Sequence, residues 1–240
     1  QGSSNTDGSI NTTYTSVNTT AGFSISQYTG TGSSATIGHG LGVAPKIVIV
    51  KRLNNADGWQ VYVDGLSSVN HYLRLDTTAG EASDSSRFGA APTASVFSVG
   101  TANGTNASGD TYIAYCFAEK TGYSKFGSYT GNGSTDGTFV YTGFKPKFVI
   151  IKDTANRNWV LNDAVRDSFN YVRNTLTPND SAAEFDNGNY NRMDFLSNGF
   201  KLKGGSAGVG NDTNASSNTY IYMAFGQSLV GSNNVPCTAR

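Results

Sequence analysis

Only two histidines occur in the 240 residues, so chemistry that depends on an imidazole has few candidates. His39 lies in the glycine-rich stretch IGHGLG, and His71 precedes the segment YLRL. A catalytic triad places a histidine between a nucleophile and an acid, and a zinc site needs several ligands at short spacing. Neither pattern surrounds these residues. We interpret both as turn or surface histidines, with His39 kept as a candidate for function because the chain does not repeat it.

Two aspartates are the best candidates for acid–base chemistry. Asp64 and Asp163 each follow a short segment that contains a tryptophan. Hydrolysis of a glycosidic bond requires two carboxyl groups within one site, whereas each half of the chain supplies one. We expect these aspartates to bond backbone N–H groups in turns. The sequence therefore predicts that the protein is not an enzyme, with a polysaccharide-degrading enzyme as the remote alternative.

Aromatic side chains give the most concrete binding chemistry. An exposed ring beside an amide or a charged group can stack on a sugar face and bond its hydroxyls. The alternative is that these rings fill a β-sandwich core. Binding groups concentrate on loops, which favours the long loop Pro178–Met193. The predicted carbohydrate-binding residues are Trp59, Trp159, Tyr190, Asn191 and Arg192.

Loops rich in oxygen-bearing side chains are the remaining candidates for a metal site. Ser4–Ser9, Asn132–Thr138 and Val209–Asn218 contain many Asp, Asn, Ser and Thr side chains, which are the ligand types that Ca²⁺ prefers. None has the EF-hand pattern or a cluster of acids. We expect Asx turns there and predict no cofactor and no metal, with loop-bound calcium as the alternative.

Composition narrows the class of partner. Lys+Arg and Asp+Glu are balanced at 17 each, and only 14% of residues are charged, so a nucleic-acid partner is not expected. No run of about 18 apolar residues occurs, so no membrane insertion is expected. The two cysteines, Cys116 and Cys237, do not form a disulfide framework, and a bridge between them stays open.

Several segments occur twice in the same order. The stretch VAPKIVIVK around Pro45 is followed by FKPKFVIIK around Pro146, and QYTGTGSS from Gln27 by SYTGNGST from Ser128. Both pairs are 101 positions apart, which is the difference between the two prolines. NASGDTYIAYCF from Asn106 matches NASSNTYIYMAF in the second half. We infer a tandem duplication of a domain of about 100 residues, a usual size for a single core.

The repeated elements have the composition of strands. In GFSISQYTG, Phe23, Ile25 and Tyr28 stand among polar residues, and clusters of Gly, Asn and Ser separate the apolar runs. A short helix within NDAVRDSFNYVRNTL is the one helical alternative. We predict an all-β protein with two tandem antiparallel β-sandwich domains, lectin-like or jelly-roll-like, related by internal duplication. The expected parts are a linker or N-terminal arm over 1–20, sandwiches over 21–121 and 122–230, and a C-terminal tail over 231–240.

Long segments of the chain resemble a known group of proteins. AGFSISQYTGTGSSATIGHGLGVAPKIVIVK, DTYIAYCFAE, GYSKFGSYTGNGSTDGTFVYTGF, DFLSNGFKL and TYIYMAF are similar to the tandem domains at the C-terminal ends of tail-fibre and virion structural proteins of marine tailed bacteriophages. The similarity extends from about Asn5 to Arg240. It implies lectin-like sandwiches and a structural virion protein, and it transfers no catalytic or binding residue.

The resemblance and the residues together predict a tail-fibre or adhesin segment that attaches the virion to host surface glycans. The alternative is a capsid decoration or tail scaffold without a ligand of its own. The expected partners are other virion proteins, host surface polysaccharide and further copies of the chain in a homo-oligomer, with a trimer favoured. The expected location is the surface of the phage particle, outside the host cell.

Overall fold

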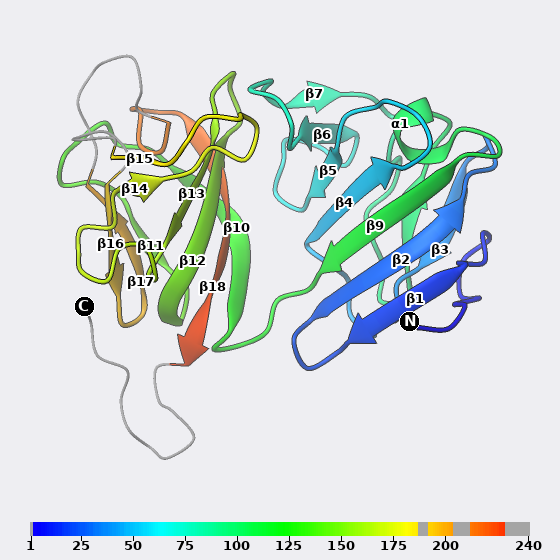
Figure 1. The fold of residues 1–240 in the computed structure, drawn as a ribbon, viewed down its shortest axis with the longest axis horizontal. Helices are drawn as coiled ribbons and strands as arrows, with labels where there is room; N and C mark the ends of the chain where they lie inside the picture. Colours follow the sequence, from blue (N-terminus) through cyan, green and yellow to red (C-terminus); the bar gives the residue numbers. More distant parts are fainter. Residues whose placement is uncertain (1, 187–191, 204–211, 229–240) are drawn as a thin grey trace. The chain divides into compact units, whose positions relative to one another are not determined.

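The computed structural model describes residues 2–186, 192–203 and 212–228, and these are nearly all β-strand and turn (Figure 1). The chain forms two compact units. Unit 1 comprises Gln1–Asp76 and Glu81–Glu119, and unit 2 comprises Thr77–Gly80 and Lys120–Arg240. Among the described residues, no helix is both long and apolar enough to span a bilayer.

Unit 1 consists of two antiparallel sheets. The larger sheet contains, in spatial order, β1 (Tyr14–Asn18), β2 (Phe23–Thr29), β9 (Thr111–Phe117), β4 (Ile47–Arg52), β5 (Gln60–Val63), β6 (His71–Arg74) and β7 (Ala82–Ser83). The smaller sheet pairs β3 (Ala35–Gly38) with β8 (Val96–Val99), and one helical turn, α1 (Asn103–Asn106), precedes β9.

The core of unit 1 lies between these two sheets, which makes the unit a β-sandwich. Val48 and Val50 of β4 pack in one buried cluster with Ile37 of β3 and with Phe97 and Val99 of β8. Alternate residues of β9 also belong to this cluster, because successive side chains of a strand point to opposite faces. The predicted antiparallel all-β sandwich is therefore confirmed.

Unit 2 is also a β-sandwich. Its first sheet contains β10 (Ser124–Thr130), β18 (Thr219–Ser228), β12 (Phe144–Asp153) and β13 (Trp159–Asp163). Its second sheet contains β11 (Phe139–Tyr141), β17 (Gly199–Leu202) and β16 (Met193–Leu196). The short pair β14 (Asn174–Thr175) and β15 (Phe185–Asp186) completes the unit, and its core again lies between the two larger sheets.

Each unit buries a stacked pair of tyrosines. Tyr28 lies on Tyr112 with ring centroids 5.2 Å apart, and Tyr129 lies on Tyr220 at 5.1 Å. The angles between the ring planes are 15° and 13°. All four rings are at most 9% exposed, so they fill the two cores.

The tyrosine hydroxyls of unit 1 hold the turn before β9. Tyr28 donates to the Thr105 carbonyl at 2.6 Å. Tyr112 donates to the Asn103 carbonyl at 2.5 Å and accepts from the Ala107 N–H at 2.8 Å. The stacked pair therefore packs the core and also satisfies backbone groups of α1 and its end.

Removing one of these hydroxyls is expected to destabilise unit 1. Tyr112→Phe keeps the ring but leaves the Ala107 N–H and the Asn103 carbonyl without their partner, which costs about 1–3 kcal/mol in the free energy of unfolding. Urea unfolding followed by tyrosine and tryptophan fluorescence measures this cost. Tyr115→Phe is the matched control, because Tyr115 lies on the opposite face of β9. An equal cost for both variants would contradict the assignment.

A buried asparagine in each unit holds the glycine-rich turn. In unit 1 the Asn106 Oδ1 accepts from the Thr31 N–H at 2.8 Å, and its Nδ2 donates to the Ser33 and Gly100 carbonyls at 2.6 and 2.8 Å. The Gly32 N–H bonds the Asn106 carbonyl at 2.8 Å. Gly32 has a φ of 74°, the left-handed region that glycine adopts without strain, so the turn requires a glycine here.

The equivalent turn of unit 2 uses Asn214 in the same manner. Its Oδ1 accepts from the Asn132 N–H at 3.1 Å, and its Nδ2 donates to the Ser134 carbonyl at 2.9 Å. Gly133 has a φ of 66°, and its N–H bonds the Asn214 carbonyl at 2.9 Å. The two units thus share the rings, the asparagine and the turn that it fixes.

Two local expectations differ from the structure. Residues 1–20 were expected to form a linker or arm, but Tyr14–Asn18 pairs along its whole length with β2. Its polar composition suits an edge strand, which has a neighbouring strand on one side only and exposes its other edge to solvent. The alternative helix after Asn162 does not form, because Asp163 and Asp167 bond local backbone N–H groups and stabilise turns instead.

The structure gives His39 a structural role. The expected position in a turn is correct, whereas the expected position at the surface is wrong. It lies in a turn but is fully buried. Its Nδ1 accepts from the Leu41 N–H at 3.1 Å, and its Nε2 lies 3.2 Å from the Thr93 carbonyl, to which it donates. Burial lowers the pKa of His39, which keeps the ring neutral and suited to both bonds.

Candidate functional site

The two tryptophans occupy different environments. Trp59 is half-buried and stacks on Tyr115, with ring centroids 6.1 Å apart. Trp159 is 2% exposed, so its ring has no free face for a sugar. The prediction that Trp159 binds carbohydrate is therefore not supported, because the recurrent ring fills space in the fold.

Of the other three predicted binding residues, the structure describes Arg192 alone. Tyr190 and Asn191 lie outside the described residues. Arg192 is half-buried, and its guanidinium lies over the Tyr171 ring at 5.1 Å from the centroid. This cation–π contact joins Arg192 to a second loop, which the sequence analysis did not select.

That second loop, residues 163–173, follows β13 and exposes large apolar side chains. Val165 is 87% exposed, Phe169 78% and Tyr171 49%. A folded chain rarely leaves several large apolar side chains of one short segment in water unless they meet a ligand or partner. Residues 166–171 and Arg173 line a pocket of about 330 Å³, so the exposed rings border a hollow.

Two aspartates hold the loop in shape. The Asp163 carboxylate accepts from the backbone N–H groups of Val165 and Arg166, both at 2.9 Å. The Asp167 carboxylate accepts from the N–H groups of Arg173 and Asn174 at 2.7 and 2.6 Å. Asp163 therefore has the turn role that the sequence predicted. The loop is ordered by these bonds, so its rings are positioned before any ligand arrives.

Asn170 is a third residue that holds the loop in place, and it lies between Phe169 and Tyr171 in the sequence. The Asn170 Nδ2 donates to the Phe195 carbonyl at 3.2 Å, and its Oδ1 accepts from the Phe195 N–H at 3.0 Å. This pair of bonds ties the loop to β16. Phe169 and Tyr171, on either side of Asn170, are held at the surface as a result.

The charges of the loop are largely balanced. Arg166 bonds Asp163 at 2.6 Å and Glu184 at 2.7 Å, and Arg173 lies 3.4 Å from Asp186. Burial alone would raise the pKa of Asp163, but its bonds from the Arg166 and Val165 N–H groups and from the Arg166 side chain hold it below the usual value. The pocket thus places two paired guanidinium groups beside exposed rings without a strong net charge.

Sequence reasoning missed Phe169 and Tyr171 because it considered their segment, NDAVRDSFNYVRNTL, as a short helix and not as a binding loop. The available signal was Tyr171, a large ring that lies off the helical spacing of Val165, Phe169 and Val172. Among the described residues, no group of three or more His, Cys, Asp or Glu side chains is arranged to hold an ion.

Taken together, the fold and this loop define an all-β sandwich protein with a surface site made of rings, amides and guanidinium groups. A family model described as Domain of unknown function (DUF7483) matches residues 1–228, and the chain belongs to this family. Nothing among the curated proteins and nothing among the solved structures matches the chain.

Proposed function

We propose that the protein is a structural virion protein of a tailed phage, a tail-fibre or adhesin segment that attaches to host surface glycans. The observation that carries the proposal is the ordered loop of residues 163–173, which presents Phe169 and Tyr171 beside Arg192 and a pocket of about 330 Å³. Rings bordered by planar hydrogen-bond donors are the usual means of binding a sugar ring.

The two units are proposed to be copies of one ancestral domain. The tyrosine stacks, the buried asparagines and the glycine-rich turns recur in both, together with the sequence repeats. The 163–173 loop does not recur in this form. A shared scaffold with one diverged loop suits a binding protein, since loops can change without loss of the core.

Weak sites gain strength when they are repeated. We propose that the chain acts as a homo-oligomer, with a trimer as the favoured state, alongside other virion proteins. Several weak sugar sites on one particle then bind a polysaccharide firmly through effective concentration. Sedimentation equilibrium of the purified chain tests the assembly, and a monomer at all concentrations would argue against this part of the proposal.

Removing both exposed rings is expected to weaken glycan binding. The double variant Phe169→Ala/Tyr171→Ala should lower the affinity for host polysaccharide by at least about tenfold, because stacking contributes on the order of 1 kcal/mol for each ring. Surface plasmon resonance on immobilised envelope polysaccharide measures this change. Val165→Ala is the matched control, since Val165 is the most exposed apolar side chain of the same loop and has no ring.

Two outcomes would count against the proposal. Equal binding by the double variant and the wild type would show that the loop is not the site. An absence of binding to polysaccharide and to susceptible cells, even for a multivalent display, would favour a capsid decoration or tail scaffold. Labelled antibody on intact particles separates these alternatives, because a decoration protein would be found on the head.

A further inference from the structure

β11 (Phe139–Tyr141) forms an edge of the second sheet of unit 2 and exposes two large rings. Among the described strands of that sheet, β11 pairs with β17 alone. Phe139 is 44% exposed and Tyr141 61%, while Val140 between them belongs to the buried core. The strand has no lysine, proline or bulge of the kind that protects exposed edges. Such an edge is a template for pairing with another chain.

The backbone groups of Phe139 and Tyr141 point out of the sheet along this edge. The Thr142 N–H donates to the Asn198 carbonyl at 3.0 Å, on the side of β17. Bonded residues alternate with unbonded ones along an antiparallel pair, so Val140 also bonds β17. The N–H and carbonyl of both Phe139 and Tyr141 therefore point away from β17. Within the described part of the chain, nothing bonds these four groups.

β11 has the same place in unit 2 that β3 has in unit 1. Ile37 of β3 lies opposite Phe97 of β8. Val140 of β11 lies opposite Phe200 of β17 in the same way. Phe97 and Phe200 each meet a core tyrosine of their own unit edge-on, at the same centroid distance of 6.3 Å. The outer edges of β3 and β11 can therefore be compared residue by residue.

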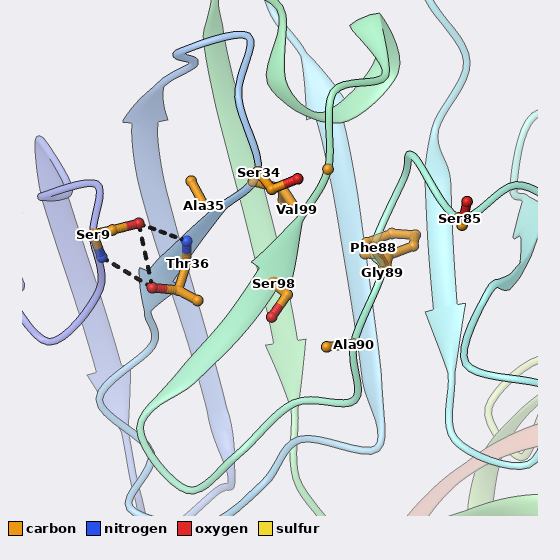
Figure 2. Close-up of a pocket in the computed structure, with 11 residues that line it drawn as sticks. Ser9, Ser34, Ala35, Thr36, Ser85, Phe88, Gly89, Ala90, Ser98 and Val99 are labelled. Atoms are coloured by element: carbon orange, nitrogen blue, oxygen red, sulfur yellow. Dashed lines mark hydrogen bonds between the residues drawn. The ribbon is translucent and has the colours of Figure 1, made fainter.

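In unit 1 the N-terminal segment of residues 8–10 closes this edge. The Ile10 N–H donates to the Thr36 carbonyl at 3.0 Å, and the Thr36 N–H donates to the Ser9 hydroxyl at 2.9 Å. Figure 2 shows Ser9 and Thr36 joined by hydrogen bonds, among the residues that line a pocket. Thr36 and Phe139 are the matching positions of the two strands. The backbone groups that are satisfied in unit 1 are thus open in unit 2.

We propose that β11 pairs antiparallel with β11 of a second copy of the chain, about a twofold axis at Val140. Phe139 then lies opposite Tyr141 of the second copy, and Tyr141 lies opposite Phe139 of the second copy. Each of these pairs exchanges two N–H···O=C bonds, because the N–H and the carbonyl of one residue in a strand point to the same side. This register uses all four open groups of each copy and joins two sheets into one.

The side chains suit this register. Phe139 and Tyr141 lie on one face of the sheet, so each phenylalanine in the joined sheet stands directly beside a tyrosine, a favourable cross-strand pair. The Phe139 ring packs so closely over β17 that a Cβ at Gly199 would lie 3.0 Å from it, which holds the ring in place. Lys201, opposite Phe139 on β17, forms an ion pair with Asp136. The face therefore carries rings and a neutralised charge.

A second copy fits this edge better than a foreign strand does. Every copy has the same open groups, and one twofold contact satisfies both copies at once. The N-terminal segment is already used, since residues 8–10 of each copy lie on β3. The contact is short and weak by itself, so it forms where copies are concentrated on one particle. It goes beyond the proposed function, because it joins copies in pairs and would link two of the proposed trimers.

Hydrogen exchange of the full chain tests the pairing directly. In dilute solution the Val140 amide should be protected by β17, while the amides of Phe139 and Tyr141 should exchange freely. In concentrated solution all three amides should be protected, and sedimentation equilibrium should show association under the same conditions.

Tyr141→Pro removes the outward N–H and with it two of the four bonds, at a sheet edge that tolerates proline. It is expected to weaken association by at least about tenfold. Tyr141→Val is the matched control, because it keeps the N–H and a strand-forming side chain, and it should associate more tightly than the proline variant. If Tyr141→Pro does not fold, the amide exchange of the wild type and the cross-linking below decide.

Cross-linking tests the register. In a Cys237→Ser background, a mixture of Phe139→Cys and Tyr141→Cys should form a disulfide, because the Cα atoms of opposite residues lie about 5.5 Å apart. Neither variant alone should do so, because identical residues are then diagonal neighbours, about 8 Å apart. Disulfides formed by Phe139→Cys alone would indicate another register and overturn the inference.

Three further outcomes would count against this contact. They are a chain that stays monomeric in concentrated solution, association that Tyr141→Pro leaves unchanged, and protection of Phe139 and Tyr141 in the dilute chain by a synthetic peptide of residues 4–13. A trimer that persists in Tyr141→Pro would keep the proposed assembly and remove this inference. Glycan binding is measured at the 163–173 loop, so its failure would leave the contact in place.

Discussion

Asn106→Ala is expected to lower the free energy of unfolding of unit 1 by about 3–5 kcal/mol, more than any surface substitution in the chain. The fully buried side chain makes three hydrogen bonds, to Thr31, Ser33 and Gly100. Alanine removes all three and leaves the backbone groups of the turn without partners. Native-state hydrogen exchange measures the loss unit by unit, because it does not require a single unfolding transition.

Two further variants make the result decisive. Asn214→Ala should produce a similar loss in unit 2, where the same side chain bonds the backbone of Asn132 and Ser134. Asn103→Ala is the control, because Asn103 is exposed and should change stability by less than about 0.5 kcal/mol. If Asn106→Ala costs less than about 1 kcal/mol, the asparagine does not hold the turn.

The second large effect is a loss of stability of unit 1 at alkaline pH. Burial raises the pKa of the Cys116 thiol from 9.0 to about 12, with a small opposing effect of Ser24. The folded state therefore binds a proton that the unfolded state releases above pH 9. The contribution of this proton to the free energy of unfolding is fully present below pH 9. About 4 kcal/mol of it is lost in total as the pH rises toward 12.

Urea unfolding of the full chain at pH 8, 9 and 10 measures the onset of this loss. Cys116→Ala is expected to flatten the profile of unit 1 between pH 9 and 10, although its stability is lower throughout because of the smaller side chain. Burial also raises the pKa of Tyr28, which adds a further loss above pH 10 in both proteins. An unchanged slope in Cys116→Ala would assign the effect to other groups.

The class of fold was predictable because strand periodicity and turn residues agree along the chain. Periodicity did not reveal which face of each strand is buried. In β2 the core face carries Ser24, Ser26 and Tyr28, while Phe23 and Ile25 are half-buried on the other face. Ser26 fits the core because its hydroxyl donates to the Gly38 carbonyl at 3.1 Å.

The site was predicted only in part. Recurrence drew attention to Trp59 and Trp159, but a ring that recurs in both halves is one that the fold itself needs. Arg192 was a better choice, since it contacts the exposed ring of Tyr171.

The placement of the tryptophans has a spectroscopic consequence. The chain has two, one on either side of the division into units, and their surroundings differ. Trp159 is buried and Trp59 is half-buried against a tyrosine ring, so their emission maxima in the folded state should differ. Each unit therefore contains its own fluorophore, and the order in which the two units unfold can be read from the intrinsic emission of the unmodified protein.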